Sequence, residues 1–444
     1  MSFVPSTRLL WFVFAAAMVA TAAGPWREPE ALWLLALGGV LLTALADVAV
    51  SMARARPPVV SVPAVVRFAR DREGAIAVTF ENPDGRARRV RFALGLPAAF
   101  APKDEETWVD LPAGAARARV EWRCTPRRRG KFSSALACVE GGSALGLWRV
   151  RARTELPCEL RVHPNLFAER KQIAALFLAQ GRNGARVQRT LGRGREFEKL
   201  RDYQPGDGFD EIHWKATAKR GRPVTKVFQA ERTQEIYVVI DASRLSARPV
   251  THDGVEQTAL ERYVTSALVL LIAAERQGDK FGLIAHDDRV RVLVRAGSGA
   301  AHYAACREAV LSLRPSEATP DMAEIVRHLR AQIRRRALLF FLSDLTDPVL
   351  AEDFAKHVRL LSRQHLVLLG QLRAPEVAPL FSGAETATDE EVYRRLAGHA
   401  RWAESRTLAQ KLKPLGVTAA LLESETMAAQ LVEHYMRVKR RQAL

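Results

Sequence analysis

The sequence is poor in cysteine and lacks the short motifs that mark common enzyme classes. Its 444 residues include only four cysteines, none of them in a CxxC pair: Cys124, Cys138, Cys158 and Cys306. No histidine stands at zinc-ligand spacing from them, which excludes the usual structural zinc sites. A G-x-S-x-G elbow, a phosphate-binding loop and an H-E-x-x-H pair are all absent. These motifs would place a nucleophile or a metal in a known context. We therefore predict that the chain is not an enzyme.

Acidic residues are scarce relative to basic ones. The chain has 67 Lys and Arg against 49 Asp and Glu, a formal net charge of +18 and a pI near 10.3. Such a balance can indicate nucleic acid, anionic lipid or an acidic protein as partner. Because Arg is spread along the whole chain, we interpret the excess as compositional bias and do not expect nucleic acid as a partner. With 48% apolar and 26% charged residues, the composition is that of a globular protein.

Two apolar runs near the N-terminus predict a helical hairpin in a membrane. They cover residues 9–23 and 31–52, and the second has the ~20 residues that a spanning helix needs. The short separation, residues 24–30, favours a tight hairpin over a cleaved signal peptide. Arg8, Arg54 and Arg56 flank the runs, so the positive-inside rule predicts a two-pass bacterial inner-membrane protein. The lipid bilayer would be a partner, and both termini and the soluble domains would be cytoplasmic. Asp47 is expected at the membrane interface.

The rest of the chain divides by pattern into three parts. Short alternating runs separated by turn signals, such as Asn82-Pro83-Asp84-Gly85, predict an antiparallel β-sandwich over residues 54–165. A polar stretch rich in Gly and Arg lies within residues 166–230. Buried strand-like runs then alternate with amphipathic helices over residues 231–444, which predicts an α/β fold with a doubly wound, mostly parallel sheet. The expected strands are 236–240, 281–286, 290–294, 337–342, 365–372 and 418–422, and the expected helices are 258–277, 301–313, 321–334, 350–362, 388–412 and 426–439.

Polar residues follow the predicted strands where a parallel sheet binds its ligands. Asp241 and Ser243 come directly after the strand at 236–240, Asp344 follows a second apolar strand, and Thr319 precedes a helix. Loops of this kind lie at the carboxyl ends of the strands. Their oxygens could hold Mg²⁺, which favours an octahedral set of oxygen ligands. The same residue types are also common helix N-caps, and spacing alone leaves the two interpretations equal.

This region resembles a von Willebrand factor A domain, whose metal-ion-dependent adhesion site combines a D-x-S-x-S loop, a Thr and a later Asp. The four residues Asp241, Ser243, Thr319 and Asp344 match that pattern. Leu245 stands where the second Ser belongs. The resemblance therefore implies a degenerate site, with Mg²⁺ weakly bound or dependent on a partner.

A second motif lies at residues 192–219, GRGREFEKLRDYQPGDGFDEIHWKATAK. It resembles the signature of the bacterial family called domain of unknown function fifty-eight, in which a membrane anchor and a von Willebrand A-like domain often accompany it. The matching positions are Gly194, Glu196, Phe197, Arg201, Tyr203, Gly206, Asp207, Trp214, Lys215 and Ala218. Departures occur at Asp210, where we expect Arg, and at His213, where Asp or Asn is more usual. Two upstream stretches, 125–131 and 145–148, also match the family.

From the residues alone, the signature segment is expected to be architectural. Glu196, Arg201, Asp207 and Lys215 could form a buried ion-pair network on the α/β core, with Trp214 packed beneath it. The family resemblance implies a MoxR-type AAA+ ATPase as partner, together with other membrane or envelope proteins. We therefore expect an adaptor module in complex assembly or envelope maintenance. The alternatives are a metal-dependent hydrolase or transferase that uses Asp241, Ser243 and Asp344, and a basic nucleic-acid binder tethered to a membrane.

Overall fold

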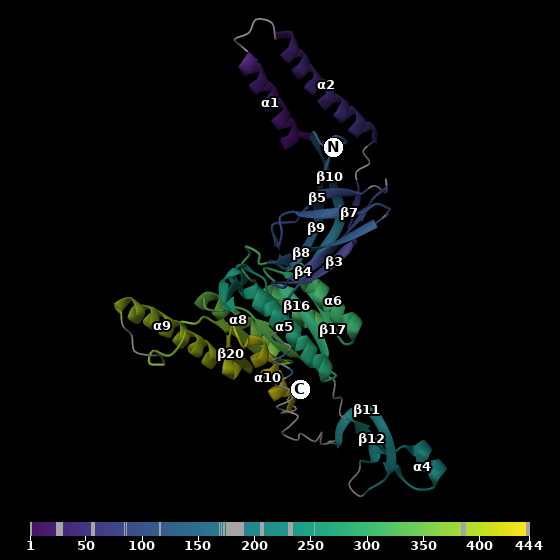
Figure 1. The fold of residues 1–444 in the computed structure, drawn as a ribbon. Helices are drawn as coiled ribbons and strands as arrows, with labels where there is room; N and C mark the ends of the chain where they lie inside the picture. The colour runs from purple at the N-terminus through teal and green to yellow at the C-terminus, as the bar shows by residue number, and fades with distance from the viewer. Residues whose placement is uncertain are drawn as a thin grey trace. The chain divides into compact units, whose positions relative to one another are not determined.

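The computed structural model divides the chain into two compact units, residues 1–165 and 166–444 (Figure 1). It describes residues 2–440 except 24–29, 55–57, 84, 86, 115–116, 168, 170, 172–173, 175–190, 205–207, 230–233, 253 and 383–387. Of the signature positions, Gly206 and Asp207 therefore lie outside the described residues.

The first unit contains two sheets that share one apolar core. One sheet has the order β1-β10-β9-β5-β7, with β3 also paired to β10, and the other has the order β2-β4-β8-β6. Every second residue of β4 and β5 is buried, as expected for strands with one face turned inward. Phe92 joins the two sheets through edge-to-face ring contacts with Phe80 and Trp122, at centroid distances of 5.0 and 5.3 Å. The strands are β1 Ser2–Pro5, β2 Val59–Ser61, β3 Val65–Ala69, β4 Gly74–Glu81, β5 Arg88–Gly95, β6 Phe100–Pro102, β7 Thr107–Leu111, β8 Arg117–Pro126, β9 Gly130–Gly142 and β10 Trp148–His163.

Two helices lie between β1 and β2 in the chain, and they do not support the predicted membrane hairpin. They are α1, Thr7–Ala23, and α2, Glu30–Arg54. In the part of the chain that the structure describes, neither helix combines the length and the apolar character needed to span a bilayer. The predicted transmembrane hairpin and two-pass inner-membrane localisation were therefore wrong. The fold class is corrected to a mixed α/β protein that contains several antiparallel sheets.

Asp47 joins α2 to the turn between β9 and β10. Its side chain is fully buried, so the expectation of a membrane-interface position was also wrong. The carboxylate accepts hydrogen bonds from the backbone N–H groups of Leu145 and Leu147, at 2.8 and 3.2 Å, and from Ser143 Oγ at 2.5 Å. Trp148 Nε1 donates to the Ala44 carbonyl at 2.9 Å. The apolar run at 31–52 thus ends in a polar contact with the β9–β10 turn, because a buried carboxylate needs donors.

The second unit is built on a six-stranded sheet with the order β17-β16-β13-β18-β19-β20. All neighbouring pairs are parallel except β16 with β17, so the antiparallel strand lies at one edge. The strands are β13 Glu235–Asp241, β16 Lys280–His286, β17 Val290–Gly297, β18 Leu338–Leu342, β19 Leu366–Arg373 and β20 Val417–Glu423. Two small antiparallel pairs accompany the sheet: β11 Leu191–Asp202 with β12 Val224–Gln229, and β14 Pro249–His252 with β15 Val255–Thr258.

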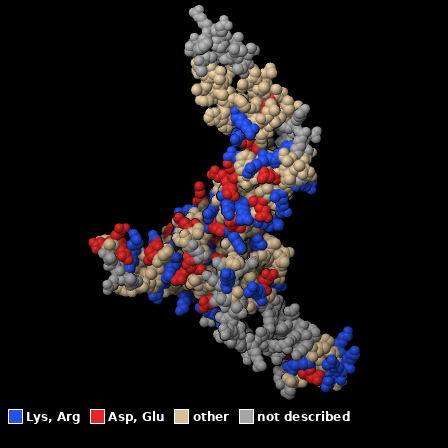
Figure 2. All heavy atoms as spheres, in the orientation of Figure 1, with Lys and Arg blue, Asp and Glu red and all other residues tan. Residues whose placement is uncertain are grey.

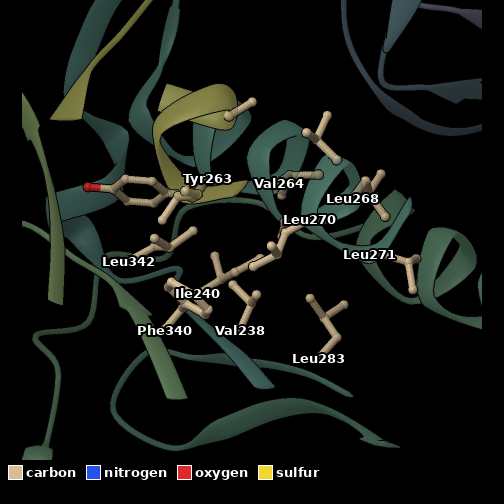
Figure 3. Close-up of a cluster of buried hydrophobic side chains, with 14 of the residues drawn as sticks. Val238, Ile240, Tyr263, Val264, Leu268, Leu270, Leu271, Leu283, Phe340 and Leu342 are labelled. Carbon is tan, nitrogen blue, oxygen red and sulfur yellow. The ribbon is translucent and has the colours of Figure 1, made fainter. Parts of the chain in front are cut away.

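Helices cover both faces of this sheet, and the alternation of side chains along β13 shows why. Ile236, Val238 and Ile240 join one core with α5, α6 and α10 (Figure 3). Tyr237 and Val239 join the other core with α7, α8 and α9. A strand buried on both faces must be apolar throughout, and β13 has no exposed residue. The helices are α4 Trp214–Arg220, α5 Ala259–Arg276, α6 Ala300–Leu311, α7 Met322–Gln332, α8 Pro348–Ser362, α9 Asp389–Leu412 and α10 Met427–Arg440, with short 3-10 turns at Phe209–Glu211, Arg244–Ala247 and Lys413–Leu415.

A buried aspartate fixes the last helix to the start of β16. Asp279 has almost no exposed surface. It accepts hydrogen bonds from the backbone N–H of Gln234 at 3.0 Å, from Lys439 Nζ at 2.7 Å and from the Tyr435 hydroxyl. Burial, followed by the contact with Asp279, raises the pKa of Tyr435, so its hydroxyl stays protonated and donates.

We predict that Asp279→Ala destabilises the protein by ~3–5 kcal/mol, because it leaves the Lys439 cation without its buried partner. Tyr435→Phe should cost only ~1 kcal/mol, because Asp279 keeps its other donors. Urea unfolding of the full chain measures both. If Asp279→Ala lowered the free energy of unfolding by less than Tyr435→Phe does, the Asp279 contacts would not be what holds α10 in place.

Candidate functional site

The predicted polar loops do meet at one edge of the sheet, which we call the carboxyl edge because the parallel strands end there. Asp241 is the last residue of β13 and is fully buried. Its Oδ1 accepts from the backbone N–H of Ser243 at 2.8 Å, and its Oδ2 accepts from Ser343 Oγ at 2.5 Å. Ser343 follows β18 directly and is itself buried. The hydrogen bonds therefore tie together the loops after two neighbouring strands.

Ser243 organises the loop that follows β13. It caps the 3-10 turn Arg244–Ala247, and its Oγ accepts from the backbone N–H of Leu245 at 3.3 Å. The loop is joined to the one that bears Thr319, since the Arg244 N–H donates to the Ala318 carbonyl at 3.0 Å. Arg244 Nε also donates to Thr319 Oγ1 at 3.1 Å. Asp241, Ser243 and Thr319 are thus used in hydrogen bonds within the protein.

Asp344, the fourth residue, forms an ion pair with Arg248. Arg248 Nε lies 3.2 Å from Asp344 Oδ2, and Arg248 Nη2 donates to the Leu372 carbonyl at 2.9 Å. The Asp344 side chain is 8% exposed and that of Arg248 is 29% exposed. Arg248 contacts Asp344, whereas Arg244 contacts Thr319.

The structure places further polar groups at the carboxyl edge, beyond the four predicted residues. His286 ends β16 and pairs in register with Asp241, and its Nε2 has no hydrogen-bond partner among the described residues. Tyr263 of α5 is fully buried, and burial, followed by the negative charges of Asp344 and Asp241, raises the pKa of its hydroxyl. Figure 3 shows the Tyr263 oxygen turned away from the aliphatic cluster. His286 ends the apolar run at 281–285, whereas Tyr263 follows Glu261 and Arg262 and carries no such signal.

Asp287, next to His286, is held as an anion at the same edge. Burial would raise the pKa of its carboxyl, but hydrogen bonds involving Asp288, Arg291 and the backbone N–H of Arg289 outweigh burial and lower the pKa to about 2. Arg291 Nε lies 2.8 and 2.6 Å from the two carboxylate oxygens. This contact fixes the β16–β17 turn beside the end of β13.

The donor set does not fit a bound Mg²⁺ ion. Both oxygens of Asp241 already accept hydrogen bonds, and the Arg248 guanidinium already supplies the positive charge beside Asp344. A second cation there would be repelled by Arg248. Within the described residues, no three His, Cys, Asp or Glu side chains gather closely enough to hold a metal ion. At this edge the positive charge beside Asp344 is therefore supplied by Arg248, in the place where a metal ion would otherwise supply it.

Asp207 and the side chain of Glu196, two members of the expected buried network, lie outside what the structure describes, and the other two are Arg201 and Lys215. Gly194, Glu196 and Phe197 lie in β11, which pairs with β12. Arg201 Nη1 donates to the Asp202 carbonyl at 3.4 Å, and the Tyr203 N–H donates to the Pro223 carbonyl at 3.0 Å. Lys215 is exposed and forms no ion pair with any described residue.

The position of Trp214 differs most clearly from the expected one. We predicted that it packs beneath the segment, but it begins α4 and is 67% exposed. The reason is local: none of the residues of α4 is buried, so this short helix has no apolar face for a core. A tryptophan in a turn-rich sequence does not by itself reveal which way it points.

Comparison with known proteins identifies part of the chain. Residues 199–397 match the family model described as protein of unknown function DUF58. The chain carries a DUF58 domain. The match begins in β11 and continues through the carboxyl edge into α9, so it includes all four predicted site residues and the signature residues from Arg201 onward.

The curated relatives are themselves uncharacterized. Rv1480 of Mycobacterium tuberculosis and Mb1516 of Mycobacterium bovis are each 24% identical to this chain over 186 residues, which is 41% of this chain. The match spans 56% of the length of each relative. Among solved structures, the conserved hypothetical protein BatB from Bacteroides thetaiotaomicron is 14% identical, covers 47% of this chain and 99% of its own, and has a TM-score of 0.31. An aerotolerance-related membrane protein from Bacteroides fragilis has a TM-score of 0.29, with 14% identity over 46% of this chain and 99% of its own. Likeness at these TM-scores carries no weight for fold or function.

We predict that Mg²⁺ and Mn²⁺ do not bind tightly to the wild-type protein, because Arg248 already neutralises Asp344. Arg248→Met should create weak metal binding, since it removes the cation and keeps a side chain of similar length. Calorimetric titration of both ions into the two proteins tests this. Tight binding to the wild type that disappears in Asp241→Ala would contradict the prediction.

A second prediction concerns pH. The pKa of Asp287 is lower in the folded protein than in the unfolded chain, so its contribution is present in full above pH ~4 and is lost as the pH falls toward 2. Asp287→Asn should therefore cost roughly 2 kcal/mol at neutral pH. The difference from wild type should shrink steadily on acidification. Urea midpoints measured across this pH range check the claim, and a constant difference would show that ionisation of Asp287 is not its source.

Proposed function

We propose that this DUF58 protein is an interaction module, an adaptor for a MoxR-type AAA+ ATPase in complex assembly or envelope maintenance, and that it is not itself an enzyme. We further propose that the second unit is a von Willebrand factor A-like domain that contacts its partner through the loops of the carboxyl edge. The ATPase comes from the family resemblance. The parallel sheet with its polar loops gives support to the domain type, because ligands of such sheets bind beyond the strand ends.

The observation that carries this proposal is the internal pairing of the chemically reactive groups. A hydrolase or transferase would need a hydroxyl that a substrate can reach and a base that is free to take its proton. Ser343 does donate to the Asp241 carboxylate, but Ser343, Ser243 and Asp241 are all essentially inaccessible. Asp344 is paired with Arg248. These groups support a fixed loop geometry better than they support turnover.

The exposed members of the edge are suited to partner contact. Arg244 and Thr319 are exposed and joined by a hydrogen bond, while Asp241 and Ser243 beneath them are buried. Binding loops that are held from below lose little conformational freedom on association, which favours affinity. The buried residues are therefore proposed to position the loops, and Arg244 and Thr319 to touch the partner.

The test measures binding of the full chain to its MoxR-type ATPase by calorimetry. The double variant Arg244→Ala, Thr319→Ala should weaken binding about tenfold or more, as removal of interface anchors does. The matched control is Arg295→Ala, because Arg295 is also exposed and hydrogen-bonded, to Gln332, but lies near the other end of the antiparallel strand β17. Unchanged affinity in the double variant would remove the carboxyl edge from the interface.

A further inference from the structure

The signature segment presents an aromatic and basic surface that none of the contacts above uses. We call it the signature face and define it by the exposed side chains Phe209, Trp214, Lys215, Lys219 and Arg220. Phe209 is 76% exposed and Trp214 is 67% exposed. Residues 208–226 contain five Lys and Arg against two Asp and Glu. Figure 2 shows the Lys and Arg gathered over the α4 end of this segment.

The backbone beneath the face is firmly held. Ile212 and Val224 are buried, and the His213 N–H donates to the Val224 carbonyl at 2.8 Å. Thr217 Oγ1 accepts from the Val224 N–H at 3.0 Å, which ties α4 to β12. Gly221 ends α4 in the left-handed conformation, with φ of 66°, where a side chain would be strained. The exposed residues are thus displayed on a fixed scaffold.

The charges of the face are not balanced within the described part of the chain. Lys215, Lys219 and Arg220 form no ion pair with any described residue. Lys215 and Lys219 are four residues apart on a helix, an arrangement in which like charges repel. Many other exposed arginines of this protein have an acidic neighbour, as Arg394 has Glu390 and Arg437 has Glu433. The unbalanced cations thus favour an anionic ligand.

We propose that the signature face is a docking site for an acidic polypeptide segment, with an apolar side chain of that segment seated against Trp214 and Phe209. Tryptophan and arginine are enriched among the residues that carry most of the binding energy at protein interfaces, and the signature face exposes Trp214 and Arg220. Lys215, Lys219 and Arg220 would attract the carboxylates and speed association. This is a second contact, separate from the loops of the carboxyl edge.

Nucleic acid is the competing ligand, and the geometry favours the polypeptide. Single strands bind in charged grooves that follow the backbone over several nucleotides, with successive bases stacked on aromatic rings. Here the unpaired cations lie on a helix of seven residues with no buried member. Such a helix offers a short convex patch, suited to a few carboxylates around one apolar anchor.

The experiment measures fluorescence anisotropy of a short labelled peptide, in which glutamates surround one leucine, as the full chain is added. The comparison probes are the same peptide with glutamine in place of every glutamate and a single-stranded oligonucleotide of equal charge. The test variants are Trp214→Ala and the double variant Lys215→Glu, Lys219→Glu. The control for Trp214→Ala is Trp108→Ala, which removes another exposed indole. The control for the lysine variant is Lys356→Glu with Lys411→Glu. It reverses the charge of two other exposed lysines that form no ion pair with described residues.

The proposal requires that the glutamate peptide binds more tightly than the glutamine peptide and the oligonucleotide. Trp214→Ala should weaken binding about thirtyfold. The lysine reversal should weaken it at least as much, the effect should shrink at high salt, and the controls should change it less than about twofold. Because Trp214 is exposed, its removal should leave the melting temperature unchanged. Equal effects in test and control variants would overturn the proposal. Tighter binding of the oligonucleotide, lost in the same variants, would replace it with a nucleic-acid site.

Discussion

A carboxylate that is fully removed from water at the end of a buried strand must receive hydrogen bonds from the protein, and Asp241 receives two. The strand that carries it, β13, lies between β16 and β18 with both faces covered, so the carboxylate cannot turn toward solvent. Its two carboxylate oxygens accept hydrogen bonds from the Ser243 N–H and the Ser343 hydroxyl. Each donor comes from a different loop. The need to satisfy one buried anion therefore brings the loops of the carboxyl edge into a single arrangement.

Arg248 supplies the positive charge in that arrangement of loops. Two like charges near each other in a buried place repel unless a cation compensates them. An external metal ion and an internal guanidinium can both do this, with different consequences. A metal ion keeps free coordination positions for a partner's oxygen, whereas Arg248 has already used Nη2 on the Leu372 carbonyl and Nε beside Asp344. The charge of Asp344 is thereby compensated within the protein, and the proposed contact with a partner falls to the exposed side chains Arg244 and Thr319.

The sequence predicted the α/β part of the chain well, and the failures have physical causes. The strand expected at 236–240 is β13, and the helix expected at 258–277 is α5, because runs buried on both faces carry strong signals. The β14–β15 hairpin was missed, since its strands are only four residues long. All four site residues reached one edge, but their partners Arg248 and Ser343 were not predicted. Hydrogen bonds between distant loops leave no periodicity in a sequence. The apolar run at 31–52 was misread because its composition does not show that Asp47 accepts hydrogen bonds from residues 98 and 100 positions away.

The two proposed contacts of the second unit differ in the physical source of their binding affinity. At the carboxyl edge, the buried network fixes the loops before binding, so affinity there depends on preorganisation. At the signature face, Trp214 and the unbalanced lysines offer apolar area and charge directly, so affinity there depends on salt and on an acidic partner. Both lie in the stretch that matches DUF58. If one partner engages both, the second contact becomes intramolecular, and two individually weak sites can hold tightly through effective concentration. The proposed adaptor role would use this property, because weak separate contacts can be released one at a time.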